Sequence, residues 1–526
     1  MHWADKIANE IVKSGKYMPY WVDDMKTPSG YAHIGSMLGP VMHSTIYRAL
    51  KDLGKEAKLT YVFNDFDVAD EFPAILQDVL DGHQGKALKM VPSPSPEFEN
   101  LADFLADDLK KSIEYLGFEA EYISSWELYK QGKFDEVIRI ALDNSEKIQD
   151  IYQKISGSQK KLSGWLPFQT ICEKCQKVGT TLVYDWDGEK VSYRCEPKLV
   201  TWAEGCGHEG KVSPFGGTGK LPWKVDWAAH WAVLGVTVEG AGKDHASKGG
   251  SYDIAMAICK DIFKYERPYK FYNEFLLIGG RKMSSSKGVG LKAHDLVKIL
   301  PAEIARFLFI SKDIKKQSNF DPYGTMAIPD LFDEYDKCWE SYTKNTDEDL
   351  ARTFILSQIN YGFLPEKEKG FFAPRFKDIA NYLSQGLSDE EVLAKLSEIK
   401  KGKIDDSELS VFEERLKYAK IWLKDFAPDE YHFELTAEVP EKAKELSDLQ
   451  KKYLSEIINI YNDDETADSL QISLYELTKS IGIPTKDVFA AIYLSLIGKT
   501  HGPRAGALLL NIGKEKVTNR FKEILN

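Results

Sequence analysis

The sequence has few cysteines, no long apolar run and no surplus of positive charge. Six cysteines in 526 residues are too few for a disulfide-rich secreted scaffold. No stretch approaches the roughly 18 consecutive apolar residues that a membrane-spanning helix needs. Residues 1–6 lack the basic segment followed by an apolar one that marks a secretory signal. These absences favour a cytoplasmic enzyme that does not enter a membrane.

Acidic residues outnumber basic ones, 81 to 69, and give a net charge of −12. This balance disfavours a protein that coats nucleic acid without specificity, but it leaves room for a local contact. Two segments have the opposite sign: residues 281–316 hold 9 Lys and Arg against 3 Asp and Glu, and residues 499–526 hold 6 against 2. Each segment is either a solvated helix face or a binding surface.

The length predicts two to four domains, and the first 70 residues indicate the class of the first one. Apolar and aromatic residues at 16–24 and 58–63 predict strands, and residues 37–53 have apolar side chains at helical spacing before Gly54. A strand, a helix and a strand in this order predict an α/β domain with a parallel sheet and crossover helices.

The rest of the chain divides at about Pro301. Before it, we expect helices at 98–117, 133–155 and 252–263 and strands at 233–238 and 271–278. After it, strand signals nearly vanish, and a capping box at Ser388–Glu391 marks one helix start. Helices are expected near 389–400, 407–425, 439–461, 467–481 and 485–497. The second half is therefore predicted to be all α-helical.

Residues 27–36 read TPSGYAHIGS and lie in the turn between the first predicted strand and helix. Open parallel sheets bind ligands beyond the carboxyl ends of their strands, and a helix N-terminus favours phosphate. Gly30 and Gly35 would let a ligand approach the backbone, and His33 can donate a hydrogen bond to a phosphate oxygen. Taken alone, the segment is also typical of an ordinary turn.

Residues 281–288 read RKMSSSKG and follow the predicted strand at 271–278. Lys282 and Lys287 would neutralise charge that builds on a leaving pyrophosphate, and the serines between them would donate hydrogen bonds. Taken alone, the segment is also typical of a polar loop or a phosphorylation site.

Five residues in the middle of the chain could hold a metal ion: Cys172, Cys175, Cys195, Cys206 and His208 form the spacing C-x2-C-x19-C-x10-C-x-H. The first pair is typical of a zinc knuckle. The fourth ligand is either Cys206 or His208. We expect a structural Zn²⁺ here; the alternative is a set of reduced thiols in a compact β insertion.

Together, about 250 residues apart, the TPSGYAHIGS and KMSSSK segments resemble the HIGH and KMSKS signatures of class I aminoacyl-tRNA synthetases. In that family both signatures lie on a Rossmann-type catalytic domain and hold ATP while the aminoacyl adenylate forms. Further segments look like the class I lysyl-tRNA synthetases: the start MHWADKIANEIVKSGKY, VDWAAHW, AGKDH, and GKTHGPR near the end. The likeness covers nearly the whole chain.

The resemblance implies a lysine–tRNA ligase whose substrates are ATP with Mg²⁺, L-lysine and tRNA(Lys). His33, Lys282 and Lys287 would be catalytic. The positions that match the nucleotide motifs are Thr27, Pro28, Ser29, Gly30, His33, Gly35, Ser36, Gly242, Asp244, His245, Lys282, Met283, Ser284, Ser285 and Ser286. Some positions depart from the pattern: Ser36 and Ser285 replace a His and a Lys of the two signatures, and Met25 and Asn273 replace a Gly and a Tyr. We hypothesise that Lys287 supplies the charge missing at 285.

A lysine substrate needs a carboxylate beside its ammonium group and an apolar wall along its alkyl stem. Candidates for the carboxylate, all at predicted strand ends, are Asp23, Asp24, Asp65 and Asp67. Candidates for the wall are Trp227, His230 and Trp231, and His245 is a further candidate for the lysine site. Strand-end aspartates also cap helices, and buried aromatic residues also serve as core, so each position has a structural alternative.

The resemblance also sets an expected domain order. Residues 1–300 would form the Rossmann-type catalytic domain, with a zinc-binding insertion at 165–215. Residues 301–350 would be a connecting helical region, and residues 351–526 an α-helical anticodon-binding region in which Arg504, Lys514 and Arg520 contact tRNA phosphates. We expect a monomer.

Two other functions stay open from the sequence. One is a class I synthetase for glutamate or arginine; several acidic candidates and no obvious arginine clamp disfavour glutamate. The other is a zinc-containing RNA-binding protein without catalysis, which the presence of His33, Lys282 and Lys287 disfavours.

Overall fold

The computed structural model describes residues 1–70, 76–77, 81–157, 165–283, 290–362, 364, 372–431, 433, 435–462, 465–482 and 484–526. These residues form two compact units. The first consists of Met1–Asp321 and Lys337–Lys367, and the second of Pro322–Asp336 and Glu368–Asn526.

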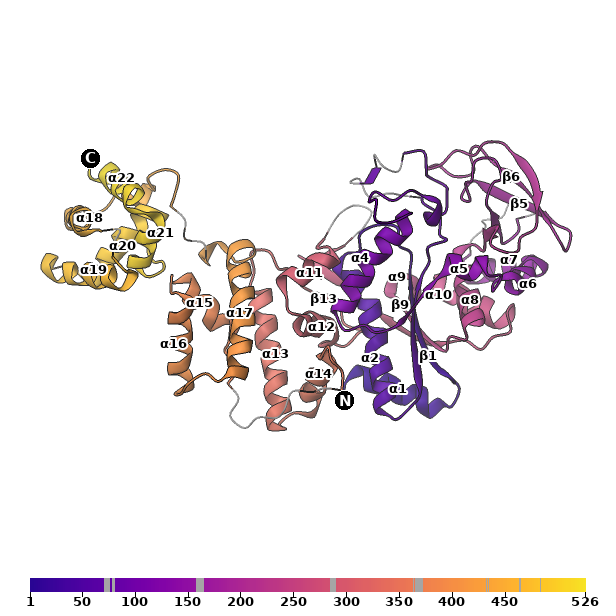
Figure 1. Ribbon diagram of the computed structural model, residues 1–526, viewed down its shortest axis with the longest axis horizontal. Helices are drawn as coiled ribbons and strands as arrows, with labels where there is room; N and C mark the ends of the chain where they lie inside the picture. The colour runs from indigo at the N-terminus through magenta and orange to yellow at the C-terminus, as the bar shows by residue number, and fades with distance from the viewer. Residues whose placement is uncertain are drawn as a thin grey trace. The chain divides into compact units, whose positions relative to one another are not determined.

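A five-stranded parallel sheet forms the centre of the first unit (Figure 1). Its strand order is β10 (Tyr269–Asn273), β9 (Val238–Gly242), β1 (Tyr20–Lys26), β2 (Ala57–Phe63) and β3 (Glu121–Ser124). From β1 the chain continues to β2 and β3 on one side and returns later to β9 and β10 on the other. Since ligands bind open sheets where the strand order reverses, the carboxyl ends of β1 and β9 are the expected site. The predicted α/β class is confirmed.

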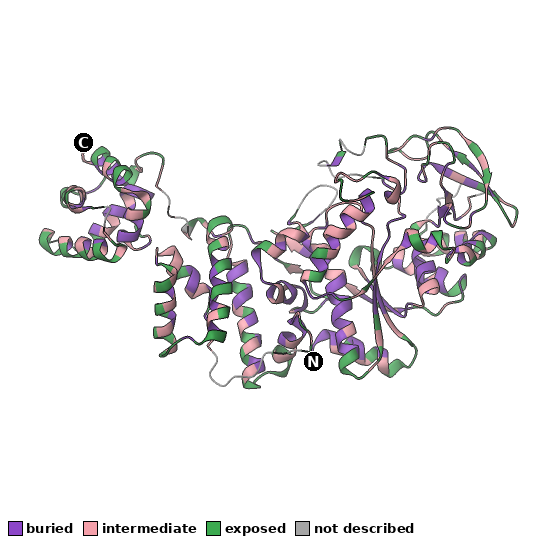
Figure 2. Ribbon diagram, in the orientation of Figure 1, coloured by how far each residue is buried: buried purple, intermediate pink, exposed green. Residues whose placement is uncertain are grey.

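Helix α2 (Leu38–Asp52) follows β1 through a short 3₁₀ turn, η1 (Ile34–Met37), and packs against β1, β2 and β9. Helix α1 (Trp3–Ser14) lies against α2, most of whose residues are buried (Figure 2). The other helices of this unit are α4 (Leu101–Tyr115), α5 (Ser125–Lys130), α6 (Asp135–Asp143), α7 (Ser145–Ser156), α8 (Trp223–Leu234), α9 (Lys243–Ala246), α10 (Ser251–Asp261), α11 (Ala293–Ile299), α12 (Ala302–Ile310) and α14 (Glu348–Ser357).

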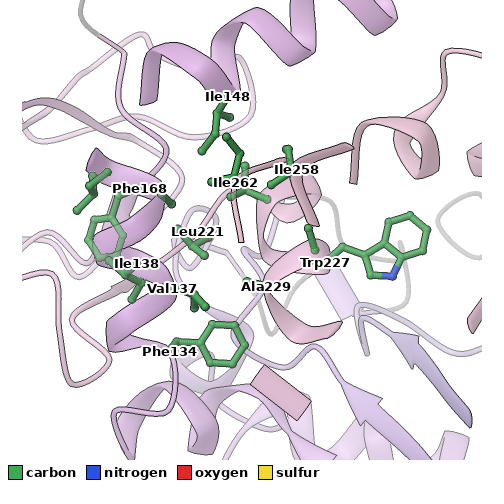
Figure 3. Packing of buried hydrophobic residues seen from close by; sticks show 14 of the residues in the cluster. Phe134, Val137, Ile138, Ile148, Phe168, Leu221, Trp227, Ala229, Ile258 and Ile262 are labelled. Atoms are coloured by element: carbon green, nitrogen blue, oxygen red, sulfur yellow. The ribbon is translucent and has the colours of Figure 1, made fainter. Parts of the chain in front are cut away.

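An apolar cluster holds α8 in place. Figure 3 shows Phe134, Val137 and Ile138 of the α6 region and Ile258 of α10 gathered around α8, which contributes Trp227 and Ala229. All α8 residues from Val225 to Trp231 are buried, as expected of a helix surrounded by other elements. Because burying each large apolar side chain stabilises the fold by about 1.5–3 kcal/mol, the cluster fixes α8 beside the carboxyl end of β9.

Several predicted elements of the first unit match the structure and others do not. The strands at 16–24 and 58–63 and the helices at 37–53, 98–117 and 252–263 are confirmed within a few residues. The strand predicted at 233–238 is wrong, because Val233 belongs to the last turn of α8 and β9 begins at Val238. The predicted 133–155 helix is two helices, which meet at Asn144, and the predicted 271–278 strand is β10 followed by β11 (Leu276–Ile278).

The cysteine-rich insertion is a small β structure. Strands β5 (Thr181–Trp186), β6 (Val191–Cys195) and β7 (Glu209–Val212) form an antiparallel sheet. At its base, β4 (Gln169–Thr170) pairs with β8 (Gly219–Lys220), so the insertion leaves and rejoins the first unit through one two-stranded ladder.

The second unit is helical in its described residues. Helix α13 (Ala327–Lys344) begins in it, and α15 (Phe376–Ser384), α16 (Asp389–Lys400) and α17 (Asp406–Asp425) pack together. Helices α18 (Asp448–Ile460), α19 (Ala467–Ile481), α20 (Thr485–Ile497), α21 (Ala505–Ile512) and α22 (Lys514–Leu525) surround a second apolar core.

The helices predicted in this half are confirmed, with one change of extent. The capping box that starts α16 forms as expected, between Ser388 and Glu391. The predicted 439–461 helix is shorter, because Ser447 caps α18 and the residues before it form a separate 3₁₀ turn. Among the described residues, no helix combines the length and apolarity that crossing a membrane requires.

Candidate active site and cysteine cluster

Two adjoining cavities lie at the carboxyl ends of β1 and β9. The first, which we call the His33 cavity, has a volume of about 240 Å³ and includes His33, Gly35, Ser36, Gly242, Asp244, Asn273, Lys282 and Met283 in its lining. The second, which we call the acidic cavity, has a volume of about 480 Å³ and includes Thr27, Ser29, Asn64, Asp67, Asp70, Trp223, Asp226, Trp227 and Glu239. Five residues line both: Asp24, Met25, Lys26, Gly242 and His245.

Backbone contacts join the first motif to residues 291–293, which follow the second motif in the sequence. His33 forms an antiparallel bridge with Lys292. The N–H of Ile34 donates to the carbonyl of Leu291 at 2.9 Å, and the N–H of Ala293 donates to the carbonyl of Ala32 at 2.8 Å. Residues 291–293 are thus fixed against the loop after β1, and Lys282 and Met283 of the second motif line the same cavity as His33. Lys287 and Ser284, Ser285 and Ser286 lie outside the described residues.

His33 is positioned as a neutral hydrogen-bond donor. Burial lowers its pKa to about 4, and the charges of Lys26 and Lys282 act in the same direction. Its Nδ1 is buried and has no hydrogen-bond partner in the described part of the chain. A neutral imidazole can donate to a phosphate oxygen without bringing a charge of its own.

Lys282 lies at the edge of the same cavity. Its Nζ donates to Oδ2 of Asp244 at 3.1 Å and lies 4.2 Å from the centre of the Phe275 ring. Burial raises the pKa of Asp244, but His245 and Lys282 outweigh that effect and the pKa is lowered overall. Because the side chain of Lys282 is 56% exposed, its ammonium group can exchange this carboxylate for an incoming phosphate.

The acidic cavity is rich in carboxyl groups. They belong to Asp24, Asp67, Asp70, Asp226 and Glu239. Glu239 is buried and accepts hydrogen bonds from the indole N–H groups of Trp227, at 2.7 Å, and of Trp231. Burial raises the pKa of Glu239 well above its ordinary value, as does the charge of Asp23, while the two indoles lower it. A cationic side chain would relieve this crowding of acids.

Two acids of this cavity already have a cationic neighbour. Lys220, at the end of β8, is 1% exposed and places its Nζ 3.0 Å from Oδ1 of Asp67 and 3.9 Å from Oδ2 of Asp226. Thr27 also donates its hydroxyl to Asp67 at 3.0 Å. Asp67 therefore faces the cavity with its charge largely compensated.

Aromatic rings form one wall of the acidic cavity. Trp223 and Trp227, one helical turn apart on α8, stack with centroids 5.8 Å apart. His245 meets both rings edge-on, at 5.5 and 6.1 Å. Such a wall can cover an alkyl chain. Trp227 and His245 were expected here from the sequence, and the i, i+4 spacing of the two tryptophans could have indicated Trp223.

Three of the residues expected to contact lysine line neither cavity. Asp23 is fully buried within the sheet and accepts a hydrogen bond from Thr60. Asp65 contacts the first turn of α5, where it accepts a hydrogen bond from the backbone N–H of Trp126 at 2.8 Å, while Ser124 is the N-cap residue. His230 is fully buried on α8, where its ring packs 4.7 Å from that of Phe134. In this structure the three side chains therefore have partners within the fold and lie outside both linings. Pro28 and Gly30 also line neither cavity.

Two further residues were not singled out from the sequence: Lys26, which lines the cavities, and His43, which lies beside the cavity residue Asp24. Lys26, directly before the first motif, lines both cavities. His43 links α2 to β9: its Nδ1 donates to the carbonyl of Gly39 at 2.7 Å, and its Nε2 accepts from the N–H of Gly240 at 2.8 Å. Both ring nitrogens are thus used by the backbone. Neither contact has a local sequence signal, because each depends on the sheet order.

The thiols of the insertion converge. The sulfur atoms of Cys172, Cys175, Cys195 and Cys206 all lie within 4.8 Å of one another. Two of the separations are 3.7 Å, between Cys172 and Cys206, and 3.6 Å, between Cys175 and Cys195. A tetrahedral zinc with Zn–S bonds of about 2.3 Å would separate its sulfurs by about 3.8 Å, so the four thiols fit Zn²⁺.

His208 does not belong to this group. Its Nε2 lies 3.8 Å from Oε2 of Glu173, at the outside of the insertion. Of the two alternatives left open by the spacing, the geometry favours Cys206 as the fourth ligand.

The three residues expected to contact tRNA differ in exposure. Arg520 is buried, and its guanidinium donates to the hydroxyl and carbonyl oxygens of Thr436, at 2.7 and 2.6 Å. Arg520 thus holds its own unit together and is not available to a phosphate. Arg504 is half-buried and pairs with Glu391 and Asp468. Lys514 is exposed at the start of α22.

Comparison with known proteins gives consistent matches. Residues 1–360 match the family described as tRNA synthetases class I (K), and residues 376–525 match an anticodon binding domain. A lysine–tRNA ligase from Archaeoglobus fulgidus is 32% identical over 527 residues, covering 100% of both chains. One from Methanocaldococcus jannaschii is 33% identical over 545 residues, covering 99% of each.

Among solved structures, a glutamate–tRNA synthetase from Elizabethkingia anophelis is similar with a TM-score of 0.43 and 13% identity, covering 96% of this chain and 99% of that chain. This likeness is too low to add to the assignment. The sequence matches, which span the whole length, carry it: the chain belongs to the class I tRNA synthetases of the lysine type.

Proposed function

We propose that this chain is a lysine–tRNA ligase that activates L-lysine with ATP and transfers it to the 3′ end of tRNA(Lys). The observation that carries the proposal is the pair of cavities with one shared wall. His33 and Lys282, from two motifs far apart in the sequence, face the first cavity, and five carboxyl groups face the second. The first suits a triphosphate and the second an amino acid with a cationic side chain.

In the first step, a carboxylate oxygen of lysine attacks the α-phosphorus of ATP. The bond from that phosphorus to the bridging oxygen breaks, and pyrophosphate leaves with the electron pair. No general base is required, because the carboxylate is already an anion. His33 donates a hydrogen bond to a phosphate oxygen, and Lys282 leaves Asp244 to neutralise the pyrophosphate. We assign Lys287 the same role as Lys282.

In the second step, a hydroxyl oxygen of the terminal adenosine of the tRNA attacks the lysyl carbonyl carbon. The bond from that carbon to the phosphate oxygen breaks, AMP leaves with the electron pair, and the hydroxyl proton passes to solvent. Mg²⁺ would accompany ATP and keep several of its waters. Zn²⁺ would be held by Cys172, Cys175, Cys195 and Cys206 as a structural ion, because four thiolates leave no open position for chemistry.

The amino acid would lie in the acidic cavity with its alkyl stem along Trp223 and Trp227. Its ammonium group would face the carboxyl groups, of which Asp24 borders both cavities. The helical domain at 376–525 would bind the anticodon, with Lys514 among its exposed cations.

ATP–pyrophosphate exchange tests this proposal. Each amino acid is supplied in turn, with and without tRNA(Lys), because tRNA can be required for activation. We expect exchange with lysine, and loss of about 10²-fold or more in the Lys282→Ala variant. Exchange with a different amino acid, or none under any condition, would refute the proposal. Lys417→Ala, a substitution on the helical second unit, serves as the control.

A further inference from the structure

Lys26 occupies a special position at the site. It is the last residue of β1, the central strand of the sheet, and its carbonyl accepts a hydrogen bond from the N–H of Asn64 at 3.0 Å, which fixes the strand end. Its side chain lines both cavities. Lys26 therefore stands at the wall that the two cavities share.

The ammonium group of Lys26 differs from its neighbours in having no partner among the described residues. Lys282 has Asp244 at 3.1 Å and Lys220 has Asp67 at 3.0 Å. In the part of the chain that the structure describes, Lys26 has neither an ion pair nor a side-chain hydrogen bond. Burial lowers its pKa, and the charges of Asp24 and Asp244 offset this only in part. The side chain of Lys26 is only partly buried. An ammonium group at a cavity wall that has no ion-pair partner attracts an anion, so an anion in the cavity would stabilise its charged form.

The other residues of the shared wall cannot hold an anion by charge. Asp24 is an acid, and Met25 and Gly242 carry no charge. Burial lowers the pKa of His245, which keeps its ring neutral near pH 7, and Lys282 and Lys26 contribute to that lowering. Of the five residues common to both cavities, Lys26 is the one cation.

We propose, on the basis of the proposed function, that Lys26 is a catalytic residue that binds a non-bridging oxygen of the α-phosphoryl group. The nucleotide fills the cavity on one side of the wall and the amino acid fills the cavity on the other. The atom at which they join is the α-phosphorus, so it lies beside the wall. The lysine carboxylate forms its new bond there while pyrophosphate departs with the bonding electrons, and no proton moves.

Two ammonium groups would thus stabilise different parts of the triphosphate. Lys26 faces the α-phosphoryl oxygens, which carry negative charge in the transition state and in the adenylate. Lys282 is paired with Asp244 and lines the His33 cavity but not the acidic cavity, so it faces the leaving group. Preorganised charges of this kind typically change a rate by about 10²–10³-fold when one is removed.

The test compares Lys26→Met, which keeps length and removes charge, with Lys26→Arg, which keeps charge. Lys16→Met, at an exposed residue just before β1, is the matched control. Single-turnover formation of lysyl-adenylate is measured with tRNA(Lys) present. Binding of L-lysine alone and of lysinol-adenylate, a stable analogue that keeps the phosphate charge, is measured by calorimetry, and Tm by thermal unfolding.

We expect Lys26→Met to slow adenylate formation by about 10²-fold and to weaken lysinol-adenylate by at least about tenfold. Lysine binding and Tm should stay near the wild-type values, Lys26→Arg should recover most of the rate, and Lys16→Met should behave as wild type. An isolated loss of phosphate-dependent binding is the result that a merely structural role would not produce.

Adenylate formation within about threefold of wild type in Lys26→Met would overturn the proposal, since a lost charge of this kind costs more. So would an equal loss of affinity for lysine and for lysinol-adenylate, which would place Lys26 in the amino-acid site. If Lys26→Met lowers Tm strongly, Lys26→Gln takes its place under the same criteria. A wild-type protein that forms no adenylate with lysine would instead refute the proposed function, and the two failures are thereby distinguished.

Discussion

Gly35 lies so close to Met283 at the His33 cavity that a Cβ built on Gly35 would be 2.9 Å from Cε of Met283 and 3.0 Å from Cε1 of His33. The two motifs thus come so close together that there is no room for a side chain at position 35. The contact explains why the loop after β1 needs a glycine here: any larger residue would push either the imidazole or the methionine out of its position.

Gly35→Ala should therefore impair nucleotide use without unfolding the protein, since Met283 ends in a flexible side chain. We expect KM for ATP in the exchange reaction to rise by about tenfold, a cost of about 1.4 kcal/mol, with Tm within a few degrees of wild type. The control is Gly402→Ala, because a methyl group added there would meet no atom of the described residues within 4 Å. Unchanged KM for ATP would show that the loop can rearrange freely.

Removing one thiol of the insertion should remove the metal. We expect one Zn²⁺ per chain in the purified protein by atomic emission, about none in Cys175→Ser, and full occupancy in His208→Ala, because the histidine lies outside the four-sulfur group. Loss of zinc in His208→Ala together with its retention in Cys206→Ser would reverse the assignment of the fourth ligand.

The stability of the first unit should fall at mildly acid pH because of His2. Its Nε2 donates to the carbonyl of Ile310 at 3.1 Å, and its Nδ1 accepts from the N–H of Ala4 at 3.2 Å. Burial lowers its pKa from 6.5 to about 4. Between those values the unfolded chain binds more protons than the folded chain, so stability is retained above pH 6.5 and decreases as the pH falls towards 4.

At pH 5 the expected loss from this one residue is about 2 kcal/mol. It is measured as the difference between wild type and His2→Asn in urea unfolding at pH 7.5 and pH 5. Carboxyl groups titrate in both proteins, so their effects cancel in the comparison. Equal pH dependence in the two proteins would rule out His2 as the source.

Two basic residues near the C-terminus should behave differently. Lys514→Ala should weaken tRNA binding and lower the slope of log K against log salt by about 0.7–0.9, because one phosphate contact is lost.

Arg520→Ala should instead lower the free energy of unfolding by about 3 kcal/mol or more, because its carbonyl partners lose a buried donor. Filter binding across salt concentrations and urea unfolding separate the two effects. A reduced salt slope in a stable Arg520→Ala protein would contradict the structural role assigned to this residue.

Local periodicity predicted the α/β class and the helical second half. The resemblance to class I synthetases, and not a local pattern, predicted that His33 and Lys282 face one site, and both line the His33 cavity. The sequence predicted less about individual acids. Asp65 and Asp67 stand two residues apart after the same strand, yet one contacts the first turn of α5 and the other faces a cavity. Which of them does which depends on where β3 and α5 lie, and no local pattern contains that position.

The same reason explains Val233 and His230. Both stand in an apolar run that is typical of a strand or of a ligand wall, whereas in the structure the run is a helix enclosed by α6 and α10. A short apolar run can form either a helix or a strand, and here packing against other elements stabilises the helix. Glu239 and Lys220 were missed for a related reason, since their roles depend on partners that lie on other elements.

Lys220 sits on β8, whose partner β4 leads within two residues to Cys172. The ammonium that compensates Asp67 is thus carried on the same ladder that anchors the sulfur cluster. Removing the metal with a chelating agent should therefore disturb the ion pair between Lys220 and Asp67 without unfolding the protein. Affinities for the amino acid should accordingly be compared between preparations of equal metal content.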